Sequence, residues 1–263
     1  MVRKLVDRWQ PKHAYTFSLS SLSSYDSMQA ITNRNFVVED WGMIDYKTAW
    51  KKQEALFQEI VRIKENNRSL DSDKCQYTPN YLIFCEHRPV YTLGKTGTKA
   101  HLLLPEATLA GKEIAFFPIN RGGDITYHGP GQLVLYPVLD LDNFFHDVHL
   151  YLRILERAVI HTLQKFQLSS GVLPGFTGVW LDATDPEKAR KICAIGIRLS
   201  RWVTMHGLAL NVNTDLSYFQ HIIPCGLQGN KVTSMEAELG YTVSMEAVKT
   251  TLKQNIIQCF ALS

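Results

Sequence analysis

The sequence predicts one α/β domain, of the α+β type, in which helices pack on a mixed β-sheet. Apolar residues recur at helical spacing in some segments, and short β-branched runs lie between those segments. The two kinds of segment alternate irregularly, with hairpins between some strands, as a mixed sheet requires. With 263 residues, 45% of them hydrophobic, the chain can bury one large core.

Residues 1–35 differ in composition from the remainder of the chain. They are rich in serine and other polar residues, with scattered arginine and lysine, which predicts a peripheral or flexible extension. A transit peptide is the alternative, but Asp7, Asp26 and the lack of a clean amphipathic stripe argue against it. We therefore expect one folded catalytic domain over residues 36–263.

Helices are predicted where apolar residues follow a capping residue at helical spacing. In chain order they cover residues 45–66 with Asp45 as the N-cap, a short segment 105–110 ended by Gly111, residues 147–167, and a last segment that begins after Ser244.

Strands are predicted from runs of β-branched and aromatic residues bounded by turn residues. They cover residues 81–87, 114–119, 132–141, 178–181, 191–199 and 203–212. The last two are expected to form a hairpin that turns through residues 200–202.

Charge and cysteine content narrow the class of protein. A net charge of only +3 argues against a nucleic-acid groove but leaves room for a local basic patch facing an acidic partner. No apolar run approaches the roughly eighteen residues of a membrane span. Five cysteines form neither a Cys-x-x-Cys pair nor an even secreted framework, which favours a reducing, cytoplasmic location. His146 and His149 have no third ligand at a matching spacing, so no metal is expected.

Cys225 is the candidate nucleophile. It stands between Pro224 and Gly226, where neither a helix nor a β-ladder is expected, so its thiol is predicted to be accessible. The reactive form is the thiolate, which needs a partner that lowers the thiol pKa from about 8.5. Lys191 is that candidate, because a partly desolvated amine at the mouth of an apolar strand can act as a base or as a thiolate partner. The alternative interpretation of Lys191 is a solvated strand end.

A cysteine beside an amine base is suited to acyl transfer through a covalent intermediate. Such a reaction needs no nucleotide if the donor is already a thioester, and the chain has no Walker-type phosphate loop. The developing oxyanion needs fixed donors. We expect these to be backbone N–H groups near Gly122, Gly123 and Gly196, helped by His128 or His206.

A glycine-rich unit over residues 121–132 supplies a second group of candidates. Two glycine turns bracket a four-residue extended piece, so that a guanidinium, an imidazole and backbone N–H groups converge. This unit is suited to hold a polar head group while the strand that follows lines an apolar slot. A second His-Gly pair, at positions 206 and 207, lies in another strand pattern with a glycine that permits close approach.

Four motifs occur in order along the chain: Arg-Gly-Gly-x-x-Thr-Tyr-His-Gly-Pro-Gly-Gln from position 121, Lys-Ile-x-Ala-Ile-Gly from 191, His-Gly-Leu-Ala-Leu-Asn from 206 and Ile-Pro-Cys-Gly from 223. Together they resemble the motifs of the octanoyltransferases of lipoate biosynthesis, the lipoate-protein ligase B family. The resemblance implies the fold of biotin and lipoate protein ligases and no cofactor. It implies that Cys225 carries the octanoyl group as a thioester and that Lys191 lowers the thiol pKa.

The resemblance also implies partners and substrate contacts. The donor would be octanoyl-acyl carrier protein, and the acceptors would be lipoyl domains of 2-oxoacid dehydrogenase E2 subunits and the glycine cleavage H protein. The implied substrate-binding residues are Arg121, Gly122, Gly123, Asp124, Ile125, Thr126, Tyr127, His128, Ala194, Ile195, Gly196, His206, Gly207, Leu208 and Ala209. Asp124 departs from the family's frequent glutamine, and Cys193 from its frequent alanine.

Two other functions remain open from the sequence. An ATP-dependent lipoate or biotin ligase of the same fold would leave Cys225 expendable. A catalytically idle relative would only bind an acylated partner.

Overall fold

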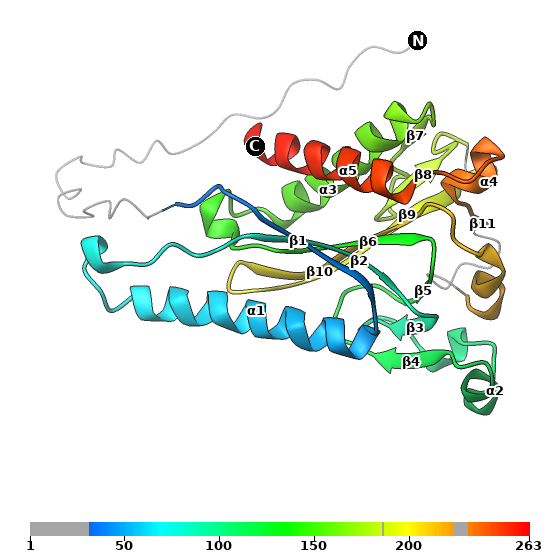
Figure 1. The fold of residues 1–263 in the computed structure, drawn as a ribbon, viewed down its shortest axis with the longest axis horizontal. Helices are drawn as coiled ribbons and strands as arrows, with labels where there is room; N and C mark the ends of the chain where they lie inside the picture. The colour runs from blue at the N-terminus through cyan, green and yellow to red at the C-terminus, as the bar shows by residue number, and fades with distance from the viewer. Residues whose placement is uncertain (1–31, 186, 224–230) are drawn as a thin grey trace, which may run out of the picture. The chain divides into compact units, whose positions relative to one another are not determined.

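The larger sheet of the molecule is mixed, as expected. The computed structural model describes residues 32–185, 187–223 and 231–263. Within these ranges eight strands form one sheet (Figure 1). Seven of them follow one another in the order β1 (Val37–Ile44), β2 (Tyr81–His87), β6 (Gln132–Val138), β10 (Val203–Asn211), β9 (Arg190–Ser200), β8 (Val179–Leu181) and β7 (Ser170–Gly171). The eighth, β11 (Lys231–Val232), pairs with β9. The β1–β2 and β9–β11 pairs are parallel, and the other pairs are antiparallel.

A smaller sheet lies apart from the larger one. It has the order β4 (Ala115–Pro118), β3 (Val90–Leu93) and β5 (Ile125–His128), in which β3 runs parallel to β4 and antiparallel to β5. The sequence predicts β4 and β5, the latter as the extended piece between two glycine turns, but not β3. The first turn brings Gly122 onto the larger sheet, where its N–H donates to Ile197 O at 2.8 Å.

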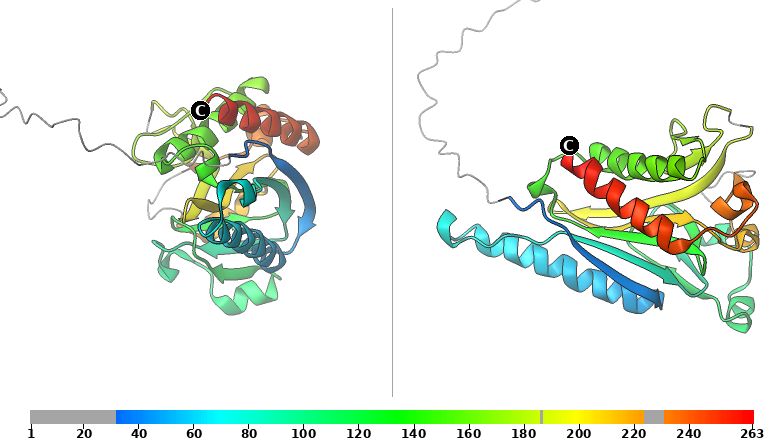
Figure 2. Two further views of the ribbon diagram at one scale, coloured as in Figure 1. Left: turned by 90° about the vertical axis from the view of Figure 1, so that its left-hand side faces the viewer. Right: turned by 45° about the horizontal axis from the view of Figure 1, so that its top comes forward.

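Helices cover both faces of the larger sheet (Figures 1 and 2). On one face lie α3 (Val148–Lys165) and α5 (Met245–Ala261), and on the other lies α1 (Tyr46–Asn67). Alternate residues of β2 serve the two layers: Leu82 and Phe84 pack toward α3 and α5, whereas Ile83 and Cys85 pack toward α1. The sheet is therefore buried on both sides, which explains its continuous apolar runs.

The predicted helix starts are confirmed by capping hydrogen bonds. Asp45 accepts from the N–H groups of residues 47 and 48, Asp147 from those of residues 149 and 150, and Ser244 from that of residue 247. The helix α3 ends at Lys165, two residues before the predicted end, because Gln167 has a positive φ of 62°. The shorter helices are η1 (Ser72–Lys74), η2 (Lys99–His101), α2 (Glu106–Gly111), η3 (Leu141–Asn143), η4 (Leu216–His221) and α4 (Met235–Leu239).

The predicted hairpin between β9 and β10 is confirmed. Ser200 pairs with Val203, and the two residues between them, Arg201 and Trp202, have φ values of 54° and 61°. Two consecutive positive φ values define the turn whose twist matches that of the strands it joins. The hairpin brings Gly196 opposite Gly207 in the middle of the sheet.

The segment before α1, for which the sequence predicts no strand, is the strand β1. It pairs with β2, which lies more than forty residues later in the chain. The pairing has no local sequence signal, since β1 is largely exposed and carries a glycine at position 42.

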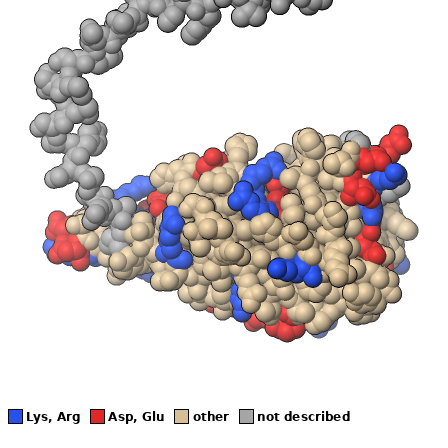
Figure 3. Space-filling view, turned by 90° about the horizontal axis from the view of Figure 1, so that it is seen from above, with Lys and Arg blue, Asp and Glu red and all other residues tan. Residues whose placement is uncertain are grey.

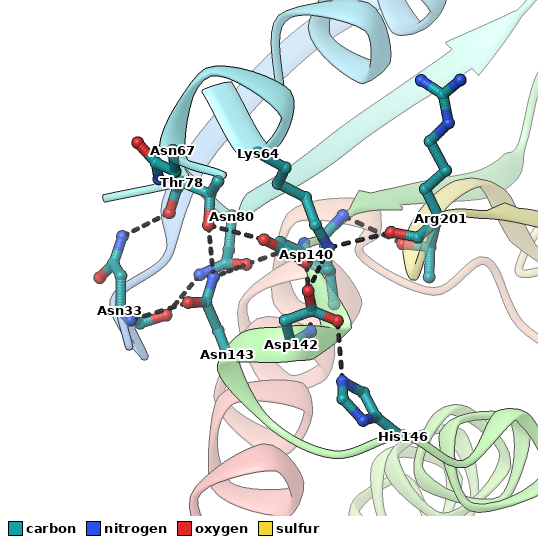
Figure 4. Close-up of polar contacts among 12 residues, drawn as sticks. Asn33, Lys64, Asn67, Thr78, Asn80, Asp140, Asp142, Asn143, His146 and Arg201 are labelled. Atoms are coloured by element: carbon teal, nitrogen blue, oxygen red, sulfur yellow. Dashed lines mark hydrogen bonds and ion pairs between the residues drawn. The ribbon is translucent and has the colours of Figure 1, made fainter. Parts of the chain in front are cut away.

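A buried polar cluster joins the end of α1 to the connection that follows β6 (Figure 4). Lys64 Nζ contacts the carboxylates of Asp140 and Asp142, and donates to Arg201 O at 2.9 Å in the hairpin turn. Asp140 also accepts from Thr78 Oγ1 at 2.9 Å. The cluster therefore links α1, the end of β6 and the β9–β10 turn through one ammonium group.

The surface over α3 and α5 carries basic and acidic side chains interspersed among uncharged ones (Figure 3). None of the helices in the described parts of the chain combines the length and the apolar character that crossing a membrane requires.

Candidate active site

The motifs predicted to be functional converge on one cavity of about 410 Å³ between β9, β10 and the glycine-rich unit. Its volume lies in the range that suits a small ligand. All of the predicted substrate-binding residues except Tyr127 line it, namely Arg121, Gly122, Gly123, Asp124, Ile125, Thr126, His128, Ala194, Ile195, Gly196, His206, Gly207, Leu208 and Ala209, as does the predicted catalytic Lys191.

Tyr127 lies behind the cavity wall. Its side chain is buried, and its ring stacks on Tyr218 with 4.6 Å between centroids. Alternate residues of a strand face opposite sides, so Tyr127 turns away while Thr126 and His128 face the cavity. The Tyr127 side chain supports the wall and does not line the cavity.

Cys225 lies outside the described residues, and the described chain on either side of it is hydrogen-bonded near the cavity. Ile223 N donates to His101 O at 2.8 Å. After the undescribed residues 224–230, Val232 pairs with Lys191 and also lines the cavity.

Lys191 lies on β9 against an aromatic wall. Its Nζ is 4.6 Å from the ring centroid of Trp180, which is fully buried. The wall approaches closely because Gly178, with φ of 116°, has no side chain: a Cβ there would lie 2.5 Å from Cys193 O and 3.6 Å from Lys191 Cε. Glu156, buried beneath, accepts from Gly178 N at 3.0 Å.

Arg121 braces the glycine-rich unit from inside. Its guanidinium is buried and donates to Thr92 O at 2.8 Å, Thr92 Oγ1 at 3.0 Å and Gly122 O at 2.9 Å. A Cβ at Gly196 would lie 3.0 Å from Gly122 O and 3.1 Å from Arg121 Cδ. The glycine of the β9 motif therefore allows the loop to lie directly on the strand.

The backbone N–H of Gly122 is not a free donor, contrary to the expectation that it helps to stabilise an oxyanion. It donates to Ile197 O at 2.8 Å, which ties the glycine-rich unit to β9. Its role is therefore to position the loop.

Asp124, which departs from the family's frequent glutamine, forms a hydrogen bond with His101. Its Oδ2 lies 2.5 Å from His101 Nδ1, and its Oδ1 accepts from Ile125 N at 2.7 Å. Because His101 O accepts from Ile223 N, this pair links the cavity lining to the segment before Cys225.

Two buried histidines, His128 and His206, line the cavity, and a third, His87, lies beside His128 with 6.0 Å between ring centroids. Burial, with a smaller contribution from the nearby Arg121, lowers the pKa of His128 and of His206 to about 3, and burial lowers that of His87 to about 4. His206 has a positive φ of 61° inside β10, and its Nε2 lies 2.7 Å from Asn120 Oδ1. Its Nδ1 is buried without a hydrogen-bond partner among the described residues. All three imidazoles are neutral near pH 7.

Several lining residues were not predicted to belong to the site. They are mainly apolar or aromatic and include Tyr46, Leu152, Phe176 and Phe219. Tyr46 follows the helical stripe of α1, and nothing in its pattern distinguishes a core face from a cavity wall. Val134 and Tyr136 also line the cavity, on the strand that was expected to line an apolar slot. Gln132 and Asn211, which end two of the motifs, also line the cavity. The sequence signal for these two residues is a polar side chain at the end of an apolar run.

No group of three potential metal ligands occurs within residues 32–185, 187–223 and 231–263. Cys85, Cys193 and Cys259 are buried, as expected of small core residues.

The fold and the site define a class of protein. Residues 45–257 match the lipoyl protein ligase A/B catalytic domain, and the chain belongs to this family. A bi-partite lipoate protein ligase from Thermoplasma acidophilum shares the fold with a TM-score of 0.61 at 17% identity, over 85% of this chain and 83% of that one. A lipoate-protein ligase A bound with ATP gives 0.58 at 16% identity, over 86% and 85%.

Sequence relatives identify the branch of the family. An octanoyltransferase from Cytophaga hutchinsonii is 54% identical over 235 residues, which cover 89% of this chain and 96% of the relative. One from Flavobacterium johnsoniae is 54% identical over 229 residues, which cover 87% and 97%. Within the family, the chain belongs with the octanoyltransferases.

Proposed function

We propose that this enzyme carries the octanoyl group as a thioester on Cys225, with Lys191 as the amine that serves the thiol. Its activity is octanoyl transfer in protein lipoylation, from an acyl donor to lipoyl domains. The observation that supports the proposal is the attachment of the chain on both sides of Cys225: Ile223 is bonded to His101, and Val232 is paired with Lys191 itself.

The reaction has two halves. First, the Cys225 thiolate attacks the carbonyl carbon of the donor thioester, the donor's carbon–sulfur bond breaks and the carrier thiol leaves. Then the acceptor lysine amine attacks the Cys225 thioester, an amide forms and the Cys225 thiol is released. Lys191 favours the thiolate in the first half and accepts the proton of the attacking amine in the second. Thioester exchange is nearly balanced and amide formation is downhill, so neither half consumes a nucleotide.

The cavity provides for an acyl chain and for the oxyanion. Leu208, Ile195, Val134 and Phe176 give it an apolar lining suited to a saturated chain. His206 Nε2 lies 2.7 Å from Asn120 Oδ1 and therefore carries the ring proton, which leaves the unpartnered Nδ1 as an acceptor. The donors to the oxyanion are therefore proposed to be backbone N–H groups near Gly123 and Gly196.

We propose octanoyl-acyl carrier protein as the donor, and lipoyl domains of 2-oxoacid dehydrogenase E2 subunits and of the glycine cleavage H protein as acceptors, in the cytoplasm. Lys95 and Lys99 lie on the loop that packs against the glycine-rich unit, where Lys95 N donates to Arg121 O at 3.0 Å. We propose that these two charges meet an acidic carrier. Removing both charges should weaken binding of the carrier at low salt and have little effect at high salt.

The proposed intermediate is tested by intact-protein mass after incubation with octanoyl-acyl carrier protein without nucleotide. The wild type should gain one octanoyl group that hydroxylamine removes, and Cys225→Ala should gain none. Cys75→Ala is the matched control, since Cys75 is the partly exposed cysteine among the described residues and should leave the adduct unchanged. Lys191→Ala should slow acylation. Turnover by Cys225→Ala with ATP and free lipoate would contradict the proposal and favour the adenylating ligase.

A further inference from the structure

Two buried amides connect opposite walls of the cavity. Gln132 opens β6, and Asn211 closes β10 beside it. Gln132 Oε1 lies 2.7 Å from His128 Nδ1, and Gln132 Nε2 donates to Asn211 Oδ1 at 2.9 Å. Asn211 Nδ2 in turn donates to Thr233 O at 2.9 Å. The glycine-rich unit is thus bonded to the strand that follows residues 224–230.

The donor and the acceptor of each hydrogen bond in this series follow from the chemistry of the groups. The carbonyl oxygen of Thr233 can only accept, so Asn211 must turn its amino group toward it and present Oδ1 to Gln132. Gln132 Nε2 donates both there and to Tyr127 O at 3.1 Å, so its own oxygen faces His128. An amide oxygen cannot donate, and His128 Nδ1 therefore carries the ring proton.

The other nitrogen of His128 is engaged as well. Its Nε2 lies 3.4 Å from Thr92 Oγ1, which already accepts from Arg121 at 3.0 Å. The Thr92 hydroxyl proton is thereby left to point at Nε2. Because the low pKa of His128 keeps the ring neutral, neither nitrogen remains as a donor for an oxyanion. His206 differs in that its Nδ1 has no partner among the described residues, but this atom is an acceptor, because Nε2 faces Asn120 Oδ1 and carries the proton.

The far end of this series of hydrogen bonds, at Thr233, reaches Lys191. Thr233 N donates to Lys191 O at 2.9 Å, and Thr233 Oγ1 donates to Glu238 Oε1 at 2.6 Å. Glu238 is itself paired with Arg190. Thr233 is thus bonded to Lys191 through its backbone and to Glu238 through its side chain, two residues after the described chain resumes.

We propose that Gln132 and Asn211 are positioning residues for octanoyl transfer: together they hold His128 in the Nδ1–H tautomer and hold Thr233, and so the strand after Cys225, beside Lys191. The inference rests on the proposed function only through the roles given to Cys225 and Lys191. It assigns His128 to the frame of the site, with neither of its nitrogens available to the reacting groups.

The variant Asn211→Asp tests the direction of the bonds. An ionised carboxylate would place an oxygen against Thr233 O, whereas a protonated one can donate to it and still accept from Gln132. We expect octanoyl transfer at pH 8 to fall in kcat by about tenfold or more, with KM for the donor nearly unchanged. The ratio of variant to wild-type kcat should rise as the pH falls to about 5.5. The ionisable groups nearest this position, His128, Lys191 and Glu238, are present in both proteins, so their own titration cancels in the ratio.

Asn213→Asp is the matched control. Asn213 makes the same kind of bond two residues later, with Nδ2 donating to Val243 O at 2.8 Å, but it lies outside the cavity lining. Its ratio to wild type should not change with pH. A rise equal to that of Asn211→Asp would overturn the proposal, because it would reflect general acid stabilisation.

Ring ¹⁵N shifts provide a second, activity-independent readout. In the wild type, the His128 signals, assigned by their loss in His128→Gln, should show the neutral Nδ1–H form between pH 6 and 8. The Nε2–H tautomer would refute the bond directions. If Cys225→Ala retained octanoyl transfer, the proposed thioester on Cys225 would be wrong. The His128 tautomer and the pH profile of Asn211→Asp would still decide whether Gln132 and Asn211 are positioning residues.

Discussion

Replacing Lys64 in the buried polar cluster tests the contribution of that cluster to stability, and the expected loss in the free energy of unfolding follows from the burial of its side chains. In Lys64→Met, the aliphatic stem is kept and the ammonium is removed from Asp140, Asp142 and Arg201 O. The Asp140 side chain is 4% exposed and that of Lys64 12%, so solvent cannot replace the lost partner. Removing one member of a buried ion pair costs about 3–5 kcal/mol of the free energy of unfolding.

The same perturbation has a pH signature. Burial already raises the pKa of Asp140 above its usual value, with the Lys64 hydrogen bond opposing that rise, and losing Lys64 must raise it further. Between the unfolded value near 3.9 and this higher folded value, the folded state binds more protons than the unfolded state. The stability of the variant relative to wild type therefore increases as the pH falls, by up to about 1.4 kcal/mol per pH unit.

Urea unfolding at pH 8 and pH 5.5, followed by circular dichroism, measures both effects. Each variant is compared with wild type at the same pH, so that protonation of the buried histidines cancels. Lys74→Met is the matched control, because the Lys74–Asp71 pair is 61% and 75% exposed and should contribute at most about 1 kcal/mol. Asp140→Asn added to Lys64→Met should recover part of the loss. Equal costs for the two lysine variants, or a Lys64→Met cost that is the same at both pH values, would refute the reasoning.

Two further predictions concern backbone conformation at the site. Gly178→Ala, measured by urea unfolding and transfer rate, should lose at least about 2 kcal/mol and slow transfer, because its Cβ would meet Cys193 O. Gly240→Ala is the control: Gly240 has φ of 77°, open space around it and no place in the cavity lining, so the variant should lose only about 1 kcal/mol and leave the rate unchanged. His206 has a positive φ of 61°, which glycine adopts more readily than alanine. We therefore expect His206→Gly to be more stable than His206→Ala by about 1 kcal/mol in the free energy of unfolding, opposite to the usual order in a strand. The reverse order would show that the positive φ carries no strain.

Local patterns predicted much of the fold. The caps at Asp45, Asp147 and Ser244 could be read because each cap forms within three or four residues of the chain. The β9–β10 hairpin could be read because its turn is short. The four motifs around the cavity were expected to act together, and all of the predicted substrate-binding residues except Tyr127 line one cavity, together with Lys191.

What the sequence could not predict depends on contacts between distant residues. The pairing of β1 with β2 and the small sheet around β3 join segments with no shared local signal. The engagement of both His128 nitrogens is equally hidden, since its partners Thr92 and Gln132 lie on different strands. Sequence reasoning could place this imidazole near the site but could not determine whether its nitrogens were free.

Among the described residues, the strand β1 is the edge of the larger sheet, and its side chains of Val37, Val38 and Met43 are exposed. Its register shifts between Asp40 and Met43, where Gly42 has a positive φ of 57° and its N–H is accepted by Asp40 Oδ1. Such a bulge bends an edge strand and withdraws a donor from any incoming strand. The irregularity thus protects a concentrated solution of this enzyme from edge-to-edge aggregation, at a strand that contributes nothing to the catalytic cavity.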